Sequence, residues 1–191
     1  MISELDHHIG RILDNLEKLS LTENTIVVFT SDHGEWLGEH LRYGKGYLGH
    51  DCVSRVPLII RYPRKIAKGK NVTQIVEGID VVPSLLDYSG IPIPQHLQGP
   101  PLTKVIQNDD NKQNSIALTE MEGWKTIRTE NFRYVLESNR CESLFDLQND
   151  PSAYRNVANE SDYASVLADH RLQLLHRLIK MERPLPAIWP Y

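Results

Sequence analysis

The feature that most constrains this chain is a run of apolar residues that ends abruptly in polar and charged ones. Residues 25–30 read Thr-Ile-Val-Val-Phe-Thr, the composition of a strand buried on both faces. Ser31, Asp32, His33 and Gly34 follow directly. Ligands of open α/β sheets bind beyond the carboxyl ends of the strands, and carboxylate and imidazole both bind divalent metals. The run therefore predicts a metal site at a strand tip, formed by Asp32 and His33, with an ordinary polar turn as the alternative.

The composition is typical of a folded globular chain. Of the 191 residues, 40% are hydrophobic and 24% are charged, which suits one domain or a domain with a small appendage. The net charge of -4 and the lack of a basic stripe argue against nucleic-acid binding. No apolar run approaches the roughly 18 residues of a membrane span. Two cysteines, Cys52 and Cys141, form neither a disulfide framework nor a zinc-type pair, so they leave the compartment open.

The first half of the chain has an α/β pattern. Apolar residues recur at spacings of three and four over residues 2–19, which predicts an amphipathic helix before the strand at 25–30. Helix, short loop and buried strand make half of a βαβ unit, so we expect the strand before the helix to lie outside this chain. The rest of this half is predicted to contain three further elements: a second buried strand over 55–63, a short strand over 72–76 and a helix over 79–88. Gly90 is expected to end that last helix.

The second half of the chain has a different pattern of predicted elements, with several short strands followed by one helix. The polar run at 107–114 predicts a boundary between residues 1–106 and 115–191. An amphipathic helix over 161–182 follows a set of short predicted strands, and the Pro-rich end from 184 to 191 is expected to be irregular. The predicted strands cover 115–120, 124–129, 132–137 and 144–147.

Two loops are candidates for function. The segment 34–50 is rich in glycine, histidine and aromatic residues, and long loops of this kind between rigid elements are often functional. The basic turn at 64–70 has the composition of a phosphate or polyanion patch, but we favour the interpretation of a solvated loop.

Six motifs stand in a fixed order along the chain. They occupy residues 25–35, 37–40, 44–46, 55–61, 78–92 and 144–156. In this order and at these spacings, the chain closely resembles the C-terminal half of a type I sulfatase, a formylglycine-dependent enzyme of the alkaline phosphatase superfamily. The same superfamily contains phosphonate monoester hydrolases. The resemblance implies an α/β fold: the C-terminal part of an alkaline-phosphatase-like α/β/α sandwich, followed by a small α+β subdomain with an antiparallel sheet and a C-terminal helix.

The resemblance also implies roles for three residues. Asp32 and His33 would be two ligands of the divalent metal that holds the sulfate, with Ca²⁺ the first expectation and Mn²⁺ or Mg²⁺ as alternatives. Many sulfatases have Asp-Asn at this place, so the Asp-His pair also admits the phosphonate-hydrolase side of the family. Lys45 matches the lysine that contacts the sulfate oxygens, where charge develops in the transition state.

Two histidines flank this lysine. Either could protonate a leaving group or contact substrate, because histidine titrates near neutral pH. We keep His50 as a catalytic candidate and interpret His40 as a residue that orders the loop. Asp51 and Arg55 are expected to position the second strand, and Asp80 to cap the start of the helix at 79–88.

One segment of the chain is similar to the cysteine motif of the family but does not match it fully. Cys52-Val53-Ser54-Arg55 resembles Cys-x-Pro-Ser-Arg, the site of formylglycine, but it lacks the proline and lies on the wrong side of the metal motif. We therefore expect the formylglycine and the remaining metal ligands outside these 191 residues, and we expect the chain alone to be catalytically inactive.

The resulting hypothesis is a fragment of a metal-dependent sulfatase. Its substrate would be a small sulfate ester or a sulfated glycan, with no nucleic acid and no membrane span involved. Two alternatives remain: a phosphonate monoester or phosphodiester hydrolase of the same superfamily, and a non-catalytic remnant that acts as a binding module. The substrate's identity and the oligomeric state are left open.

Overall fold

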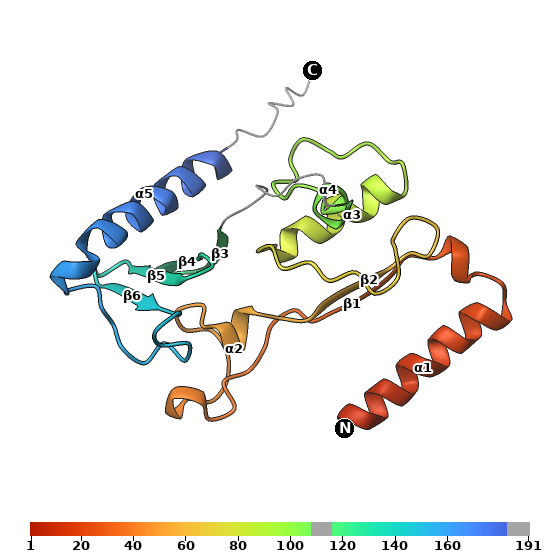
Figure 1. The fold of residues 1–191 in the computed structure, drawn as a ribbon, viewed down its shortest axis with the longest axis horizontal. Helices are drawn as coiled ribbons and strands as arrows, with labels where there is room; N and C mark the ends of the chain where they lie inside the picture. Colours follow the sequence, from red (N-terminus) through yellow and green to blue (C-terminus); the bar gives the residue numbers. More distant parts are fainter. Residues whose placement is uncertain (108–115, 183–191) are drawn as a thin grey trace, which may run out of the picture. The chain divides into compact units, whose positions relative to one another are not determined.

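The computed structural model describes residues 1–107 and 116–182, and these residues form two compact units (Figure 1). The first unit consists of Met1–Ser31 and Pro57–Val72, and the second begins with Asp32–Val56 and resumes at Thr73. The chain therefore leaves the first unit at residue 31, returns to it at residue 57 and leaves it again at residue 72.

The first unit holds a helix and a two-stranded sheet. Helix α1 (Ile2–Lys18) and a 3-10 turn, η1 (Thr22–Asn24), lead into β1 (Val27–Thr30), which pairs antiparallel with β2 (Leu58–Arg61). The predicted helix and both strands are confirmed, the strands at shorter lengths. No residue of α1 is buried, and β1 is half-buried rather than covered on both faces, because its sheet has two strands.

The second unit begins with short helical segments. They are η2 (Glu39–Leu41), α2 (Asp51–Ser54), η3 (Gly78–Asp80), α3 (Val81–Tyr88) and α4 (Thr103–Gln107). The helix predicted over 79–88 is confirmed as α3. Gly90 ends it with a φ of +71°: its N–H donates to the Asp87 carbonyl, and that of Ile91 to the Leu86 carbonyl. The short strand predicted over 72–76 is wrong, because within the described residues this segment pairs with no neighbouring strand.

A four-stranded antiparallel sheet follows in the second unit. Its strands run in chain order as β3 (Ala117–Met121), β4 (Trp124–Arg128), β5 (Phe132–Glu137) and β6 (Glu142–Asp146). The predicted hairpin between the second and third of these strands is confirmed, and β6 begins two residues earlier than predicted.

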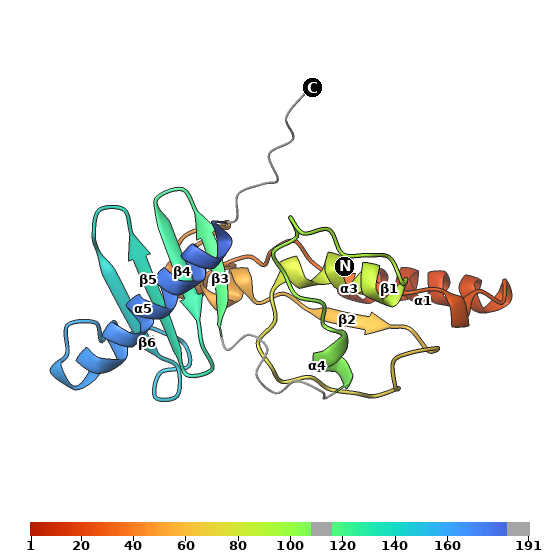
Figure 2. The ribbon, with the colours of Figure 1, turned by 90° about the horizontal axis from the view of Figure 1, so that it is seen from above.

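Helix α5 (Ala164–Met181) lies across this sheet (Figure 2), after a 3-10 turn, η4 (Ser161–Tyr163). The helix was predicted correctly, but its buried face is narrower than expected. Leu175 and Ile179, counted among its apolar stripe, are 53% and 56% exposed. His170 lies on the inner face instead, buried between Leu167 and Leu174 in the helix. The core of this unit is a cluster from the sheet, the helix and the turn between them: Ile127, Tyr134, Leu144, Val157, Leu167 and Leu174.

The predicted fold class is confirmed: an α/β chain with antiparallel sheets and a C-terminal helix. The predicted boundary at 107–114 and the irregular end at 184–191 fall, apart from Gln107, outside the described residues, so the division into 1–106 and 115–191 stays a prediction. In the described part of the chain, no helix has the length and apolar character to cross a membrane.

Candidate active site

The Asp32-His33-Gly34 motif is fixed by a close backbone approach. The Gly34 N–H donates to the carbonyl oxygen of Val53 at 2.7 Å. A Cβ atom at position 34 would lie 2.0 Å from the Cys52 carbonyl oxygen, so glycine alone fits here. The motif is thereby held against α2 within the second unit.

Asp32 and His33 carry two metal-binding atoms near one another. His33 Nδ1 lies 2.8 Å from the Gly34 carbonyl oxygen, which can only accept, so Nδ1 carries the ring proton. Nε2 is then the basic nitrogen, and it lies 3.5 Å from Asp32 Oδ2. An imidazole oriented by a carbonyl beside a carboxylate is a donor set that suits a divalent cation. The side chain of His33 is 37% exposed and that of Asp32 is 84% exposed, so a cation in solution can reach both.

These two donors make only part of a coordination sphere. Across residues 1–107 and 116–182, no group of three or more His, Cys, Asp or Glu side chains is arranged to hold a metal ion. Affinity for a divalent cation follows the number and charge of its ligands. The residues present therefore fit such a cation chemically, but two donors alone would bind it weakly.

Trp36 organises the loop that carries Lys45. Its backbone N–H donates to the Gly44 carbonyl at 3.0 Å, and its indole Nε1–H donates to the Gly46 carbonyl at 3.2 Å. Trp36 is only 5% exposed, so the residue that makes both bonds is itself held by packing. Lys45 is an exposed residue between two carbonyls that Trp36 binds, one through its backbone N–H and the other through its indole.

The same loop has an unusual backbone. Five of its non-glycine residues have positive φ angles, between 47° and 60°: Leu37, His40, Leu41, Tyr47 and Leu48. Such conformations cost free energy, and they cluster at functional sites where the surroundings hold them in place. The loop interpreted from composition as functional is therefore also the most strained segment of the described chain.

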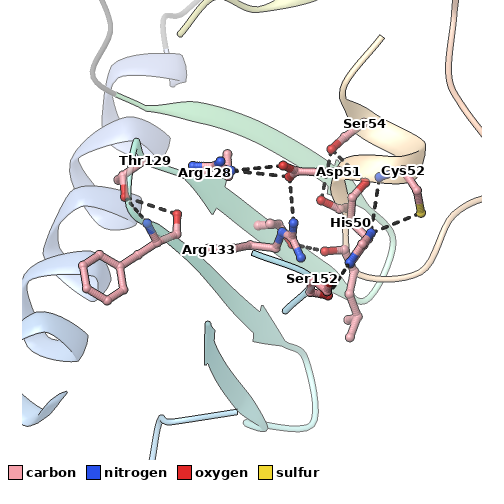
Figure 3. A network of polar contacts seen from close by, with 12 residues as sticks. His50, Asp51, Cys52, Ser54, Arg128, Thr129, Arg133 and Ser152 are labelled. Atoms are coloured by element: carbon pink, nitrogen blue, oxygen red, sulfur yellow. Dashed lines mark hydrogen bonds and ion pairs between the residues drawn. The ribbon is translucent and has the colours of Figure 1, made fainter. Parts of the chain in front are cut away.

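His50 is held through both ring nitrogens. Its Nδ1 accepts from the Cys52 N–H at 3.3 Å and lies 3.1 Å from Cys52 Sγ, and its Nε2 lies 3.4 Å from the Ser152 carbonyl oxygen (Figure 3). Burial, followed by the nearby Arg133 charge, lowers the pKa of His50. The neutral ring, with its proton on Nε2, satisfies all of these contacts.

Asp51 connects α2 to the four-stranded sheet. Arg133, in β5, is 2% exposed, and its Nη2 lies 2.7 Å from Asp51 Oδ1, while Arg128 lies within 3.4 Å of the same oxygen (Figure 3). Partial burial would raise the pKa of the Asp51 carboxyl, but the two guanidinium groups hold it below its usual value. The sequence predicted that Asp51 positions the second strand, whereas its side chain pairs with arginines of β4 and β5.

Asp80 forms a reciprocal cap with Glu77. Asp80 Oδ2 accepts from the Glu77 N–H at 2.8 Å, so Asp80 caps the 3-10 turn η3; at the start of α3 its side chain makes no capping bond, contrary to the prediction for that helix. Glu77 in turn accepts from the Leu118 N–H and pairs with Arg177, so it joins the start of α3 to β3 and α5. This buried cluster is structural and lies outside the candidate site.

Cys52 and Cys141 are both free thiols. Burial raises the pKa of the Cys52 thiol, which opposes a role as a nucleophile. Cys141 is exposed, in the turn between β5 and β6.

Sequence reasoning missed three residues beside the site. Ser152 and Tyr154 come from the turn after β6, and Arg133 lies inside a strand. The turn signal at Asp150-Pro151 was visible, but nothing in the sequence linked it to a loop more than 100 residues earlier. A charged residue within the apolar pattern of β5 was the one available hint of a buried ion pair.

Comparisons with known proteins agree with this fold. Residues 38–181 match the family model described as N-sulphoglucosamine sulphohydrolase, C-terminal. The chain is 33% identical over 174 residues to the N-acetylglucosamine-6-O-sulfatase of Bacteroides thetaiotaomicron, covering 84% of this chain and 31% of that protein. It is 30% identical to arylsulfatase K of Homo sapiens, covering 100% of this chain and 38% of that protein.

Two solved structures are also similar. One is a protein in complex with its substrate D-glucosamine-2-N,6-O-disulfate, with a TM-score of 0.84 and 31% identity, covering 94% of this chain and 39% of that one. The other is the phosphonate monoester hydrolase of Agrobacterium radiobacter, with a TM-score of 0.87 and 29% identity, covering 95% and 40%.

The fold and the matched sequence place the chain in the class of alkaline phosphatase superfamily hydrolases. Within that class, it belongs to the sulfatase family and corresponds to the family's C-terminal region. The chain spans about a third of the length of the curated relatives it matches.

Proposed function

We propose that this chain is the C-terminal part of a metal-dependent sulfatase that hydrolyses sulfate esters. The observation that carries the proposal is the Asp32–His33 pair, whose Oδ2 and Nε2 atoms lie 3.5 Å apart on a motif that Gly34 fixes against α2. The relatives named as sulfatases, and a structural neighbour solved with a sulfated glucosamine, support the sulfate ester as substrate class.

Each candidate residue has a distinct task in this proposal. Asp32 and His33 would hold a divalent cation, Ca²⁺ by preference because the carboxylate is a hard ligand, with Mn²⁺ or Mg²⁺ as alternatives. Such a cation supplies positive charge to the sulfate oxygens. The Lys45 ammonium would contact the same oxygens and stabilise the negative charge that develops as the ester bond breaks.

His50 keeps its place as a catalytic candidate in this proposal. Both of its ring nitrogens already have partners, the Cys52 N–H and the Ser152 carbonyl. His50 therefore also acts as a positioning residue, which links the start of α2 to Ser152. The formylglycine nucleophile is expected from residues outside this chain, in keeping with the raised pKa of the Cys52 thiol.

The metal assignment can be tested on residues 1–191 directly. Mn²⁺ is paramagnetic and broadens the NMR signals of nearby nuclei, so titration should broaden the Asp32 and His33 signals first, and Ca²⁺ should reverse the effect by competition. In Asp32→Ala the broadening at His33 should weaken, whereas Asp14→Ala, an exposed aspartate of α1, should change nothing. Broadening spread over all acidic residues would contradict the assignment.

Activity is tested in the natural polypeptide that carries residues 1–191, purified at its full length. We expect turnover of an aryl sulfate that a chelator abolishes and that added metal restores. Turnover that is insensitive to the chelator would refute the metal site.

A second activity is favoured by one observation: the metal motif is Asp-His, and a phosphonate monoester hydrolase is among the similar structures. An aryl phosphonate monoester should therefore be assayed beside the aryl sulfate. A higher kcat/KM for the phosphonate would assign the chain to a phosphonate hydrolase.

A further inference from the structure

Four rings form a continuous row beside the Lys45 loop. The ring centroids of Tyr154 and His40 are 4.1 Å apart, those of His40 and His50 4.6 Å, and those of His50 and Trp36 4.8 Å. Trp36 is the residue that fixes the carbonyls on either side of Lys45. The rings of Trp36 and His40 are also in contact, with centroids 5.8 Å apart, so three of the rings contact one another and Tyr154 joins them by stacking on His40.

The two histidines in the row differ in what their ring nitrogens do. His40 Nε2 lies 2.7 Å from the Ser152 carbonyl oxygen, which accepts the ring proton and leaves Nδ1 as the basic nitrogen. His50 uses its Nδ1 to accept from Cys52. Nδ1 of His40 has no hydrogen-bond partner within the part of the chain that the structure describes. Of the two imidazoles, His40 is thus the one with an acceptor available to a ligand.

Tyr154 provides an open aromatic face at the outer end of the row. Its ring lies nearly parallel to that of His40, with an interplanar angle of 6°, so one face is covered. The residue is nevertheless 66% exposed. An exposed aromatic ring that is stiffened by stacking offers a flat apolar surface at low entropic cost.

His40 itself is held in a strained conformation. Its φ is +49°, and Leu41 beside it has a φ of +58°. Left-handed backbone at non-glycine residues persists only where the surroundings over-determine it. The carbonyl of Ser152 and the rings of Tyr154, His50 and Trp36 contact His40 and hold it in place.

We propose that His40 and Tyr154 form the contact site for the organic part of the ester, the alcohol from which sulfate is cleaved. A sugar ring or an aryl ring would lie on the open face of Tyr154, and a hydroxyl group of the ligand would donate to His40 Nδ1. This assignment rests on the proposed function, because it places the alcohol next to the loop that presents Lys45 to the sulfate. It gives His40 a ligand contact where the sequence indicated only a loop-ordering role.

The experiment is an NMR titration of the labelled 191-residue chain with four probes. D-glucosamine and 4-nitrophenol represent the sugar and aryl sources of the alcohol, inorganic sulfate represents the other half of the ester, and 4-nitrophenyl sulfate is the whole. We expect at least one of the two alcohols to shift the ring signals of His40 and Tyr154 at millimolar concentration. Inorganic sulfate should leave both rings unmoved.

Matched variants separate contact from folding. Tyr154→Ala should weaken alcohol binding about tenfold, the upper end of a ring-stacking contribution, and Tyr154→Phe should keep it within about twofold. His40→Phe retains a ring to stack on Tyr154 but removes the Nδ1 acceptor together with the bond to Ser152, so D-glucosamine should bind several-fold more weakly. The controls are Tyr43→Ala, an 81% exposed tyrosine of the same loop, and His7→Phe in α1, both expected to bind like the parent.

Two outcomes overturn the inference. One is that neither alcohol moves the His40 and Tyr154 rings, and the other is that Tyr154→Ala and Tyr43→Ala weaken binding equally. Failure of the proposed function has a different signature: the full-length polypeptide would not hydrolyse the ester even though the rings respond to the alcohol.

Discussion

Arg133 and Asp51 stand 82 residues apart in sequence, yet Nη2 of the arginine lies 2.7 Å from Oδ1 of the aspartate. Arg133 is inside β5 and 2% exposed, and Asp51 is the first residue of α2. This ion pair attaches the segment that flanks the Asp32–His33 motif to the four-stranded sheet. The site is therefore built on the sheet through a charge pair rather than through apolar packing alone.

Removing the aspartate should be costly. Asp51→Ala leaves Arg133 buried without its carboxylate, and breaking a buried pair costs about 3 kcal/mol. Urea unfolding followed by circular dichroism measures the loss. The matched control is Glu120→Ala, which removes an exposed pair with Lys125 and should cost less than about 1 kcal/mol. Equal losses in the two variants would mean that the Asp51 pair is no more than a surface contact.

The close approach at Gly34 predicts an asymmetry between two glycine substitutions. Gly34→Ala places a Cβ atom 2.0 Å from the Cys52 carbonyl oxygen, so the backbone must shift, at a cost of about 1–3 kcal/mol. Gly10→Ala, inside α1 with no atom within 4 Å of the added Cβ, should stabilise the chain by about 0.5–1 kcal/mol. Unfolding midpoints compare the two. A Gly34→Ala variant that retains parental stability would show that the backbone at α2 is not fixed.

The buried carboxyl of Asp80 predicts a pH dependence of stability. Burial, with Glu77 nearby, raises its pKa from 3.8 to about 6. The folded state therefore binds this proton more tightly than the unfolded chain, and the free energy of unfolding should fall as pH rises from about 4 to about 6. Asp80→Asn cannot titrate and should lose this part of the slope.

The measurement for Asp80 is a series of urea unfolding curves between pH 4 and pH 7. Asp14→Asn, at an exposed position of α1, serves as the control and should keep the parental slope. Identical slopes in the parent and in Asp80→Asn would refute the assignment of the proton to Asp80.

Lys45 should matter to turnover but not to folding. Removal of one group that stabilises developing charge lowers kcat by about 10²–10³, so Lys45→Ala in the full-length polypeptide should lose that much with an unchanged unfolding midpoint. Lys68→Ala, in the basic turn of the first unit, is the control and should retain activity. If both variants keep full kcat on the aryl sulfate, Lys45 does not contact the sulfate.

Regular elements could be predicted because their causes are local. The apolar spacing of α1 and the glycine after α3 each leave a pattern in a short window, and so do the short strands joined as the β4–β5 hairpin. The strand predicted at 72–76 failed because alternation describes an extended chain but does not provide a partner strand. The exposed Leu175 and Ile179 show a related limit: helical spacing gives a stripe, but not how much of it the sheet covers.

The candidate site was only partly accessible to sequence reasoning. Asp32, His33 and Lys45 lie close together in the chain, and family resemblance marks all three. The residues that hold this region in place lie far away in the sequence. Arg133 and Ser152 reach it only through tertiary contacts, which no local pattern encodes. The sequence analysis kept His50 as the catalytic candidate and gave His40 a loop-ordering role, but it could not show which ring nitrogen of each histidine already has a partner.

One carbonyl oxygen, that of Ser152, faces the ring nitrogens of both histidines. An insertion or deletion between β6 and residue 152 would move this oxygen and release two imidazoles at once. The length of this turn therefore constrains the conformation of the loop at 34–50, which lies about 100 residues earlier in the chain. If Tyr154 contacts the alcohol as proposed, substrate preference would change through the side chain at position 154, while the number of residues before it stays constant.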